Sequence, residues 1–186
     1  MSLFQISYLV LWFIVVMQTY LLIQVSKTKQ ARPIKVENND YTLIHEDHGI
    51  PQGERFPQMQ FRTVNKGSIN LNRIPANGGF LIAVTSLSCN QCKVTYPILE
   101  KYNKKFHSLQ IIVLSEGQEE DVIQNMHNYQ LTMPVVPISD ISEYQTSYAP
   151  FFYYLSPQGE VIAKSVILEE EQLLMLLNKG NYLQVS

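Results

Sequence analysis

Cys89 and Cys92 are separated by two residues, Asn90 and Gln91, and the chain has no other cysteine. A disulfide between them would close a very short loop and remove little chain entropy, so it would stabilise the fold poorly. The pair is better suited to chemistry. Two thiols at this spacing can exchange disulfides with another molecule, or they can contribute two of the four ligands of a zinc ion.

The elements around the pair favour redox chemistry. Residues 80–86 are an apolar run that predicts a buried strand, and a helical pattern follows over 91–106 with Val94, Ile98, Leu99 and Tyr102 on its inner face. Cys89 then falls at the helix amino terminus, where unpaired N–H groups and the helix dipole stabilise a thiolate. We expect Cys89 to be the exposed attacking thiol and Cys92 the partly buried resolving thiol, with Lys93 adding positive charge nearby.

The remaining patterns predict a mixed α/β domain. Two short extended segments flank a turn at 65–67, and later strands alternate with helices before a final hairpin and helix. The order is β-β-β-α-β-α-β-β-β-α, which predicts a mixed sheet sandwiched by helices. The further predicted strands are 60–64, 68–71, 111–114, 134–138, 151–155 and 161–167, and the further helices are 119–129 and 169–178.

The amino-terminal segment predicts a membrane anchor. Residues 3–25 carry no charged side chain and would form a helix of about 34 Å, long enough to cross a bilayer. No basic residue precedes the segment and no small-residue cleavage site follows it, so an uncleaved anchor fits better than a signal peptide. We therefore expect an anchor at 1–25, a polar linker at 26–52 and one folded domain at 53–186.

The residues from Cys89 to Tyr102 resemble the active-site helix of the thioredoxin superfamily. Lys93 and Pro97 stand where that helix carries a lysine and a kink-forming proline. Tyr148-Ala149-Pro150 fits the segment in which the superfamily has a cis-proline opposite the disulfide. The resemblance implies a thioredoxin-like fold, a cis Ala149–Pro150 bond, and a client-binding surface formed by Ala149, Pro150 and Ser88.

Within the superfamily, the chain is similar to the membrane-anchored TlpA and ResA branch. The resemblance covers about residues 50–178, including Gly53 and Pro57 before the first hairpin and a β-α insertion at about 109–138. The anchor makes the chain most similar to the MauD type, an accessory of methylamine dehydrogenase maturation. One departure concerns proton transfer: the buried aspartate of cytoplasmic thioredoxins is Ala83 here, so deprotonation of Cys92 would need water or another carboxylate, for which Glu116 is a candidate.

Localisation and partners follow from the resemblance. Lys27, Lys29 and Arg32 follow the anchor, and the positive-inside rule alone would place the domain in the cytoplasm. The resembling proteins face away from the cytoplasm, so we expect a single-pass protein of the bacterial cell membrane with an extracytoplasmic domain. Its partners would be the lipid bilayer at 3–25, client proteins with thiols or a disulfide, and a membrane redox protein.

Other readings of the chain remain open. A net charge of −2 argues against nucleic-acid binding, and no cofactor or metal is expected beyond the Cys89–Cys92 disulfide. His45 and His48 could still join the cysteines in a zinc site of two cysteines and two histidines. A non-enzymatic assembly accessory would need the cysteines only for packing or metal. The aromatic residues between 144 and 154 could pack in the core or line a substrate groove.

Overall fold

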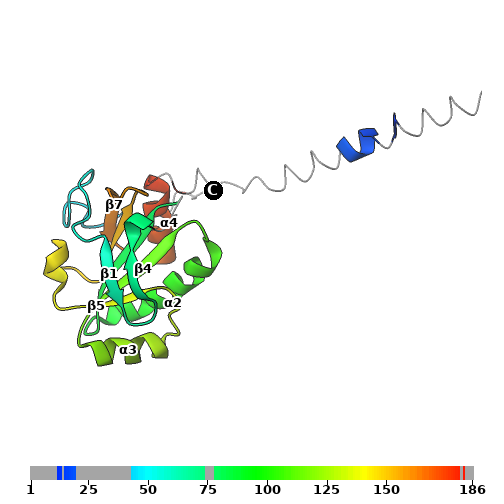
Figure 1. The fold of residues 1–186 in the computed structure, drawn as a ribbon. Coiled ribbons are helices and arrows are strands. Elements are labelled where there is room, and N and C mark those ends of the chain that lie inside the picture. Colours follow the sequence, from blue (N-terminus) through cyan, green and yellow to red (C-terminus); the bar gives the residue numbers. More distant parts are fainter. Residues whose placement is uncertain (1–11, 14, 20–42, 74–77, 181, 183–186) are drawn as a thin grey trace, which may run out of the picture. The chain divides into compact units, whose positions relative to one another are not determined.

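The computed structural model describes residues 12–13, 15–19, 43–73, 78–180 and 182 (Figure 1). The chain divides into two compact units, residues 1–35 and 36–186. The described residues of the first unit are helical and expose apolar side chains, including Trp12 and Phe13. Most of the predicted anchor, 3–25, lies outside the described residues. Among the helices that are described, none has the length and apolar character needed to span a membrane.

The second unit is built on a five-stranded mixed sheet with the order β5-β4-β3-β6-β7 (Figure 1). Strand β3 is central; it runs parallel to β4 on one side and antiparallel to β6 on the other. β4 and β5 are parallel, and β6 and β7 form an antiparallel hairpin. The strands are β3 Phe80–Ser86, β4 Gln110–Glu116, β5 Val135–Ile138, β6 Phe151–Leu155 and β7 Val161–Val166.

The helices and the small hairpin lie close to where the sequence predicts them. The hairpin is a separate two-stranded sheet that precedes β3. Two short 3₁₀ helices, η1 and η2, were not predicted. The elements are β1 Gln60–Thr63, β2 Gly67–Asn70, η1 Leu71–Arg73, α2 Asn90–Lys105, α3 Glu119–Asn128, η2 Ile141–Tyr144 and α4 Glu170–Lys179.

The two faces of the sheet are covered differently. Along β3, Leu81 and Ala83 belong to one buried cluster and Ile82 and Val84 to another, as strand alternation requires. The α-helices α2, α3 and α4 all contribute to the cluster of Leu81. The other cluster takes residues from β1, η1, η2 and the segment before β1. The sequence predicted helices on both faces of the sheet. In the described residues, the three α-helices all pack on the face of Leu81, so this prediction is corrected. On the other face, the connection between β5 and β6, residues 139–150, forms only the short helix η2.

One face prediction for α2 is also wrong. Val94 is 56% exposed, whereas the buried positions of the helix include Cys92, Tyr96 and Leu99. These three follow the 3.6-residue period of a helix, and Val94 falls outside their stripe.

The packed unit begins before residue 53. Ile44 pairs with Val166 at the edge of β7, and Ile50 is 1% exposed. Residues 43–52, which the sequence predicted as linker, therefore lie against the domain, since burying these isoleucines removes apolar surface from water. The rest of the predicted linker, 26–42, lies outside the described residues.

Candidate redox site

The site forms where β3 ends and α2 begins. All seven residues of β3 are buried, so the strand is a rigid base for the segment that follows. Cys89 is the N-cap of α2, with extended backbone angles (φ −86°, ψ 110°). The backbone N–H of Cys92 donates to the Cys89 sulfur over 3.1 Å, and the two cysteines form a disulfide. In the reduced protein, the same N–H would stabilise a thiolate at Cys89.

The two sulfur atoms differ in access. Cys89 is half-buried, whereas Cys92 has an exposed fraction of 0% and packs within the cluster that includes Leu81 and Tyr96. An external disulfide can approach Cys89 but not Cys92. The burial therefore agrees with the order of attack that the sequence predicts.

The segment before β6 lies against the disulfide. The Ala149–Pro150 peptide bond is cis, which confirms the prediction. The Cys89 sulfur lies 3.1 Å from the carbonyl oxygen of Ala149, so a reduced Cys89 thiol can donate to that oxygen. Thr146, which is 3% exposed, donates its hydroxyl to the Tyr148 carbonyl and accepts the Tyr148 N–H. These bonds hold the backbone that approaches the sulfur.

The other residues predicted from the active-site helix point elsewhere. Ser88 is exposed, and its hydroxyl lies 2.9 Å from that of Ser86. The Lys93 ammonium donates to the side-chain oxygen of Asn90 over 3.0 Å, so it bonds this amide and not a sulfur. Pro97 lies inside α2 and is exposed. None of these three side chains has a recorded hydrogen bond to Cys89, Cys92 or Ala149 among the described residues.

Glu116 is the last residue of β4 and is half-buried. It pairs in register with Ser86 on β3, and its backbone carbonyl accepts the N–H of Leu87. Among the described residues, its carboxylate has no recorded hydrogen bond or ion pair. The structure therefore places Glu116 near the end of the strand that leads to Cys89, without a recorded contact to Cys92.

A buried polar group that sequence reasoning missed lies on the face of the sheet that packs against α2. The Thr85 hydroxyl donates to the Leu114 carbonyl over 3.1 Å and accepts the Tyr96 hydroxyl over 3.2 Å. Ser115, the register partner of Thr85, is 1% exposed, and its hydroxyl has no partner among the described residues. Hydroxyl residues inside otherwise aliphatic strands were the available signal.

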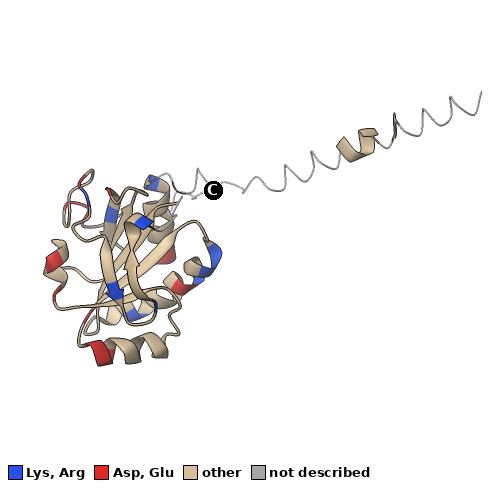
Figure 2. Ribbon diagram, in the orientation of Figure 1, with Lys and Arg blue, Asp and Glu red and all other residues tan. Residues whose placement is uncertain are grey.

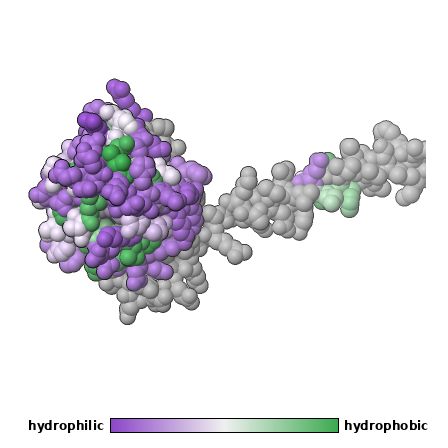
Figure 3. Space-filling model, turned by 90° about the horizontal axis from the view of Figure 1, so that it is seen from below, coloured by the Kyte–Doolittle hydropathy of each residue, from purple (hydrophilic) through white to green (hydrophobic). Residues whose placement is uncertain are grey.

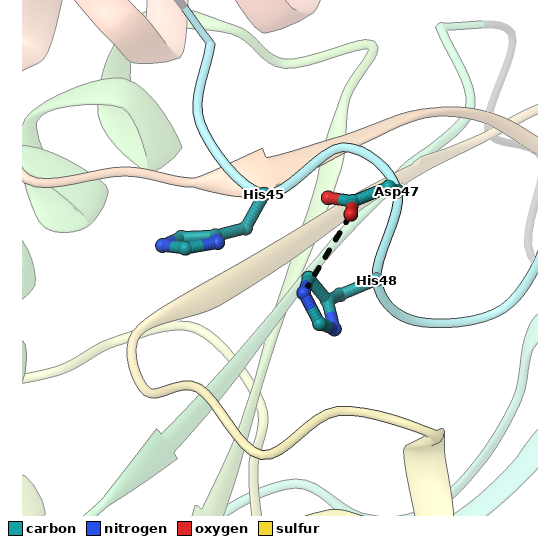
Figure 4. Close-up of side chains that lie close together, drawn as sticks. All are labelled: His45, Asp47 and His48. Atoms are coloured by element: carbon teal, nitrogen blue, oxygen red, sulfur yellow. Dashed lines mark ion pairs between the residues drawn. The ribbon is translucent and has the colours of Figure 1, made fainter.

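His45, Asp47 and His48 lie close together in the loop before β1 (Figure 4), and the rings of the two histidines contact Tyr148. The His45 ring stacks on the Tyr148 ring at 4.1 Å between centroids, and the His48 ring meets it edge-on at 4.8 Å. The predicted alternative of a shared zinc site with Cys89 and Cys92 is not formed: the sulfur atoms are outside this cluster and are bonded to each other.

The surface carries mixed charge and small apolar patches. Figure 2 shows acidic residues at the amino-terminal end of α3, where Glu119, Glu120 and Asp121 occupy the first turn, and basic residues elsewhere on the same view. The face in Figure 3 shows hydrophobic side chains in separate patches among hydrophilic ones. Within the described part of the domain, Val94 is the large hydrophobic side chain that is most clearly exposed, two residues after Cys92.

Comparison with known proteins identifies the fold. No protein-family model and no curated protein matches the chain. Among solved structures, the thioredoxin domain of a thiol-disulfide oxidoreductase from Bacteroides vulgatus is 19% identical, with a TM-score of 0.60 over 69% of this chain and 97% of that chain. A putative thiol:disulfide interchange protein DsbE from Chlorobium tepidum is 14% identical, with a TM-score of 0.59 over 69% and 99%.

StoA from Bacillus subtilis is 17% identical, with a TM-score of 0.53 over 64% of this chain and 94% of that chain. These likenesses span nearly the whole of the compared domains. The chain therefore has the thioredoxin fold. Two of these neighbours are described as a thiol-disulfide oxidoreductase and a putative thiol:disulfide interchange protein.

Proposed function

We propose that the protein is a thiol–disulfide oxidoreductase that exchanges disulfides with client proteins through Cys89 and Cys92. One observation carries the proposal: a half-buried Cys89 caps α2, bonded to a fully buried Cys92 and in contact with the Ala149 carbonyl. A purely structural disulfide would not need one accessible sulfur at a helix amino terminus. The neighbouring structures support the same class of activity.

The reduced form acts in two steps. The Cys89 thiolate attacks one sulfur of a client disulfide, which forms a Cys89–client bond and releases the other client sulfur as a thiolate. The Cys92 thiolate then attacks the Cys89 sulfur, forms the Cys89–Cys92 disulfide and releases the second client thiolate. The client gains two electrons and the protein loses two. The reverse sequence oxidises a client dithiol.

The client would bind beside Ala149 and Pro150. An extended client segment can pair with the exposed backbone groups of the segment before β6, as peptides do when they add to a strand. Ser88 and Val94 are both exposed near the cysteines, so Ser88 would offer a hydroxyl and Val94 an apolar contact. Glu116 is our proposed proton acceptor for Cys92, and Glu116→Gln should slow the second step if this role is correct.

We further propose that residues 3–25 tether the domain to the cell membrane on its extracytoplasmic side. The uncharged segment and the similarity to the MauD, TlpA and ResA proteins support this placement. A membrane redox protein would then restore the working redox state after each exchange. A reporter fused to the carboxy terminus should be active only outside the cytoplasm, and activity confined to the cytoplasm would overturn the placement.

A trapping experiment with the full-length chain tests the exchange itself. Cys92→Ser should accumulate a mixed disulfide with a disulfide-containing substrate such as insulin, because the resolving thiol is gone. Cys89→Ser should form none, and Ser88→Ala should turn over substrate as the unchanged protein does or with a modest loss. Full exchange activity in Cys89→Ser would exclude the proposed mechanism.

The redox potential decides the direction of electron flow. Thiol alkylation of the full-length chain across glutathione buffers gives the midpoint potential of the Cys89–Cys92 couple. A midpoint potential near about −270 mV, the value of thioredoxin, would indicate a reductase. A midpoint potential near about −120 mV would indicate an oxidase. Absence of a reversible couple, with function that survives thiol blocking, would favour the non-enzymatic accessory role instead.

A further inference from the structure

We propose that His45, Asp47 and His48 form a binding site for a divalent metal ion of the zinc type, beside the redox site. The proposal concerns a loop that takes no part in the exchange mechanism, and it does not depend on that mechanism. Two imidazoles and one carboxylate are a donor set that zinc accepts in proteins, with a fourth position left for water or another ligand.

The potential ligand atoms are already close together. One nitrogen from each histidine and one Asp47 oxygen all lie within 4.8 Å of one another. Nε2 of His48 is 3.8 Å from Oδ2 of Asp47, and Figure 4 shows that carboxylate directed toward the His48 ring. Ligand atoms around tetrahedral zinc are separated by about 3.4 Å, given metal–ligand distances near 2.1 Å. Closing this difference requires shifts of about 1.4 Å or less, and the exposed Asp47 side chain has the freedom to make them.

Tyr148 restrains the two imidazoles. The His45 ring lies nearly parallel to the Tyr148 ring, with 17° between their planes, and the His48 ring is inclined by 75°. Because His45 stacks through its ring face, the nitrogens at its ring edge stay available for a metal. Because both rings are restrained before the ion arrives, binding loses less side-chain entropy than it would in a mobile loop.

The backbone of the loop is held at both ends. The Ser165 hydroxyl donates to the Ile44 carbonyl over 2.9 Å and accepts the Ile44 N–H. The Lys164 ammonium donates to the Gly49 carbonyl over 2.9 Å, and the Ile50 N–H donates to the Tyr153 hydroxyl over 3.3 Å. These bonds come from β6 and β7, so the ligands project from a loop whose ends are fixed by the sheet.

Local charge also permits a cation. Lys164 is 4% exposed and donates to the loop backbone, and Lys179 pairs with Glu46 of the same loop. Burial lowers the pKa of Lys164, while the charges of Asp47, Glu54 and Glu46 act in the opposite direction. These carboxylates offset the ammonium charge. Glu46 is already paired with Lys179, whereas the exposed carboxylate of Asp47 has only His48 beside it among the described residues, so Asp47 would bring negative charge to a bound divalent ion.

The position of the site gives it a second consequence. Tyr148 immediately precedes Ala149, whose carbonyl oxygen contacts the Cys89 sulfur. An ion bound to His45 and His48 would therefore sit beside the backbone at which we place the client. The open coordination position could accept a carboxylate or imidazole of a client, or a water molecule.

Metal titration of the oxidised full-length chain tests the site. With the disulfide closed, Cys89 and Cys92 cannot provide thiolates, so their own affinity for zinc does not contribute. Calorimetry with Zn²⁺ should show one ion per chain, and Co²⁺ should give the visible absorption of a site with nitrogen and oxygen ligands. His45→Gln and His48→Gln should each weaken binding by about tenfold or more, and Asp47→Asn should also weaken it.

The two remaining histidines provide the matched control. His107 and His127 are exposed outside the loop, and His107→Gln and His127→Gln should leave the affinity unchanged. Thermal unfolding of each metal-free variant checks that the fold is kept. The proposal would be overturned if the chain showed no saturable Zn²⁺ binding. It would also be overturned if the His45→Gln and His48→Gln variants bound Zn²⁺ as tightly as the unchanged chain. Insulin reduction by the metal-free protein reports on the exchange separately, so either proposal can fail alone.

Discussion

The sulfur of Cys89 lies 3.1 Å from the carbonyl oxygen of Ala149, although the two residues are far apart in the sequence. The contact exists because β3 and β6 are antiparallel neighbours, with Val84 opposite Phe151. The last residues of β3 and the first residues of β6 therefore lie side by side at the same end of the sheet. The attacking sulfur and the backbone proposed to bind the client are therefore fixed by the same buried pair of strands.

The difference in burial between the cysteines predicts unequal alkylation. In the reduced, folded protein, iodoacetamide should modify Cys89 at least about tenfold faster than Cys92, because Cys92 has no exposed surface and Cys89 does. Peptide mass spectrometry after short reaction times measures both rates. In the unfolded protein the two rates should converge. Equal rates in the folded protein would show that Cys92 is accessible in solution.

The contacts of Glu100 predict that the free energy of unfolding decreases at acidic pH. Its carboxylate accepts two hydrogen bonds from Thr132, over 2.9 and 2.8 Å, and pairs with Lys104 at 3.2 Å. Burial raises the pKa of Glu100, but these partners outweigh it and hold the pKa below its ordinary value of 4.5. The unfolded chain then binds the proton more tightly, so this stabilisation is present above pH 4.5 and is lost as the pH falls toward the folded pKa.

Glu100→Gln should therefore lower the free energy of unfolding by roughly 1–3 kcal/mol at neutral pH. The difference from the unchanged protein should shrink as the pH falls below 4.5. Urea unfolding across this pH range measures both effects. Glu120→Gln, at an exposed position of α3, is the matched control and should change stability little at any pH. A pH-independent effect of Glu100→Gln would contradict the role assigned to the charged carboxylate.

Two glycines allow a comparison of steric conflict in the loop before β1. Gly49 and Gly53 both have positive φ, 76° and 85°. A side chain at Gly49 would collide with the Tyr153 hydroxyl and the Phe151 ring, whereas Gly53 has open space around it. Gly53→Ala should lose about 1 kcal/mol from backbone strain alone. Gly49→Ala should lose roughly 2–4 kcal/mol in urea unfolding, and equal losses would mean that the loop moves aside freely.

Much of the central fold was predictable because its signals are local. The buried run of β3, the cysteines after it and the helical pattern of α2 are consecutive in the sequence, and the structure places β3 at the predicted bounds. Pro150 was recognisable from the resemblance to the superfamily's cis-proline segment, which precedes a strand at the same place. Val94 was misplaced because an apolar residue near the start of a helix fits more than one stripe of a 3.6-residue period.

Contacts between distant segments could not be predicted. Ile44 pairs with Val166, and His45 stacks on Tyr148, but neither pairing leaves a local pattern in the sequence. The polar residues around His45 therefore favoured a linker, although the sheet holds their loop. Glu116 shows the same limit, because sequence position alone does not reveal where its carboxylate points.

The buried hydroxyls of Thr85 and Ser115 predict effects of opposite sign. Thr85 donates to the Leu114 carbonyl and accepts from the Tyr96 hydroxyl, so Thr85→Val keeps the shape but removes both bonds and takes away the acceptor of the buried Tyr96 hydroxyl. It should lose about 1–3 kcal/mol of stability. Ser115 has no hydrogen-bond partner among the described residues, so Ser115→Ala removes a desolvated hydroxyl and should be neutral or stabilising by up to about 1 kcal/mol.

Urea unfolding of both variants measures these changes under identical conditions. Because Thr85 and Ser115 are register partners on the face that packs against α2, they share one environment, and each serves as the control for the other. A loss in Ser115→Ala as large as that in Thr85→Val would show that the Ser115 hydroxyl is bonded in solution. That result would place a third bonded hydroxyl in the polar group of Thr85 and Tyr96, on the side of the sheet where Cys92 is buried.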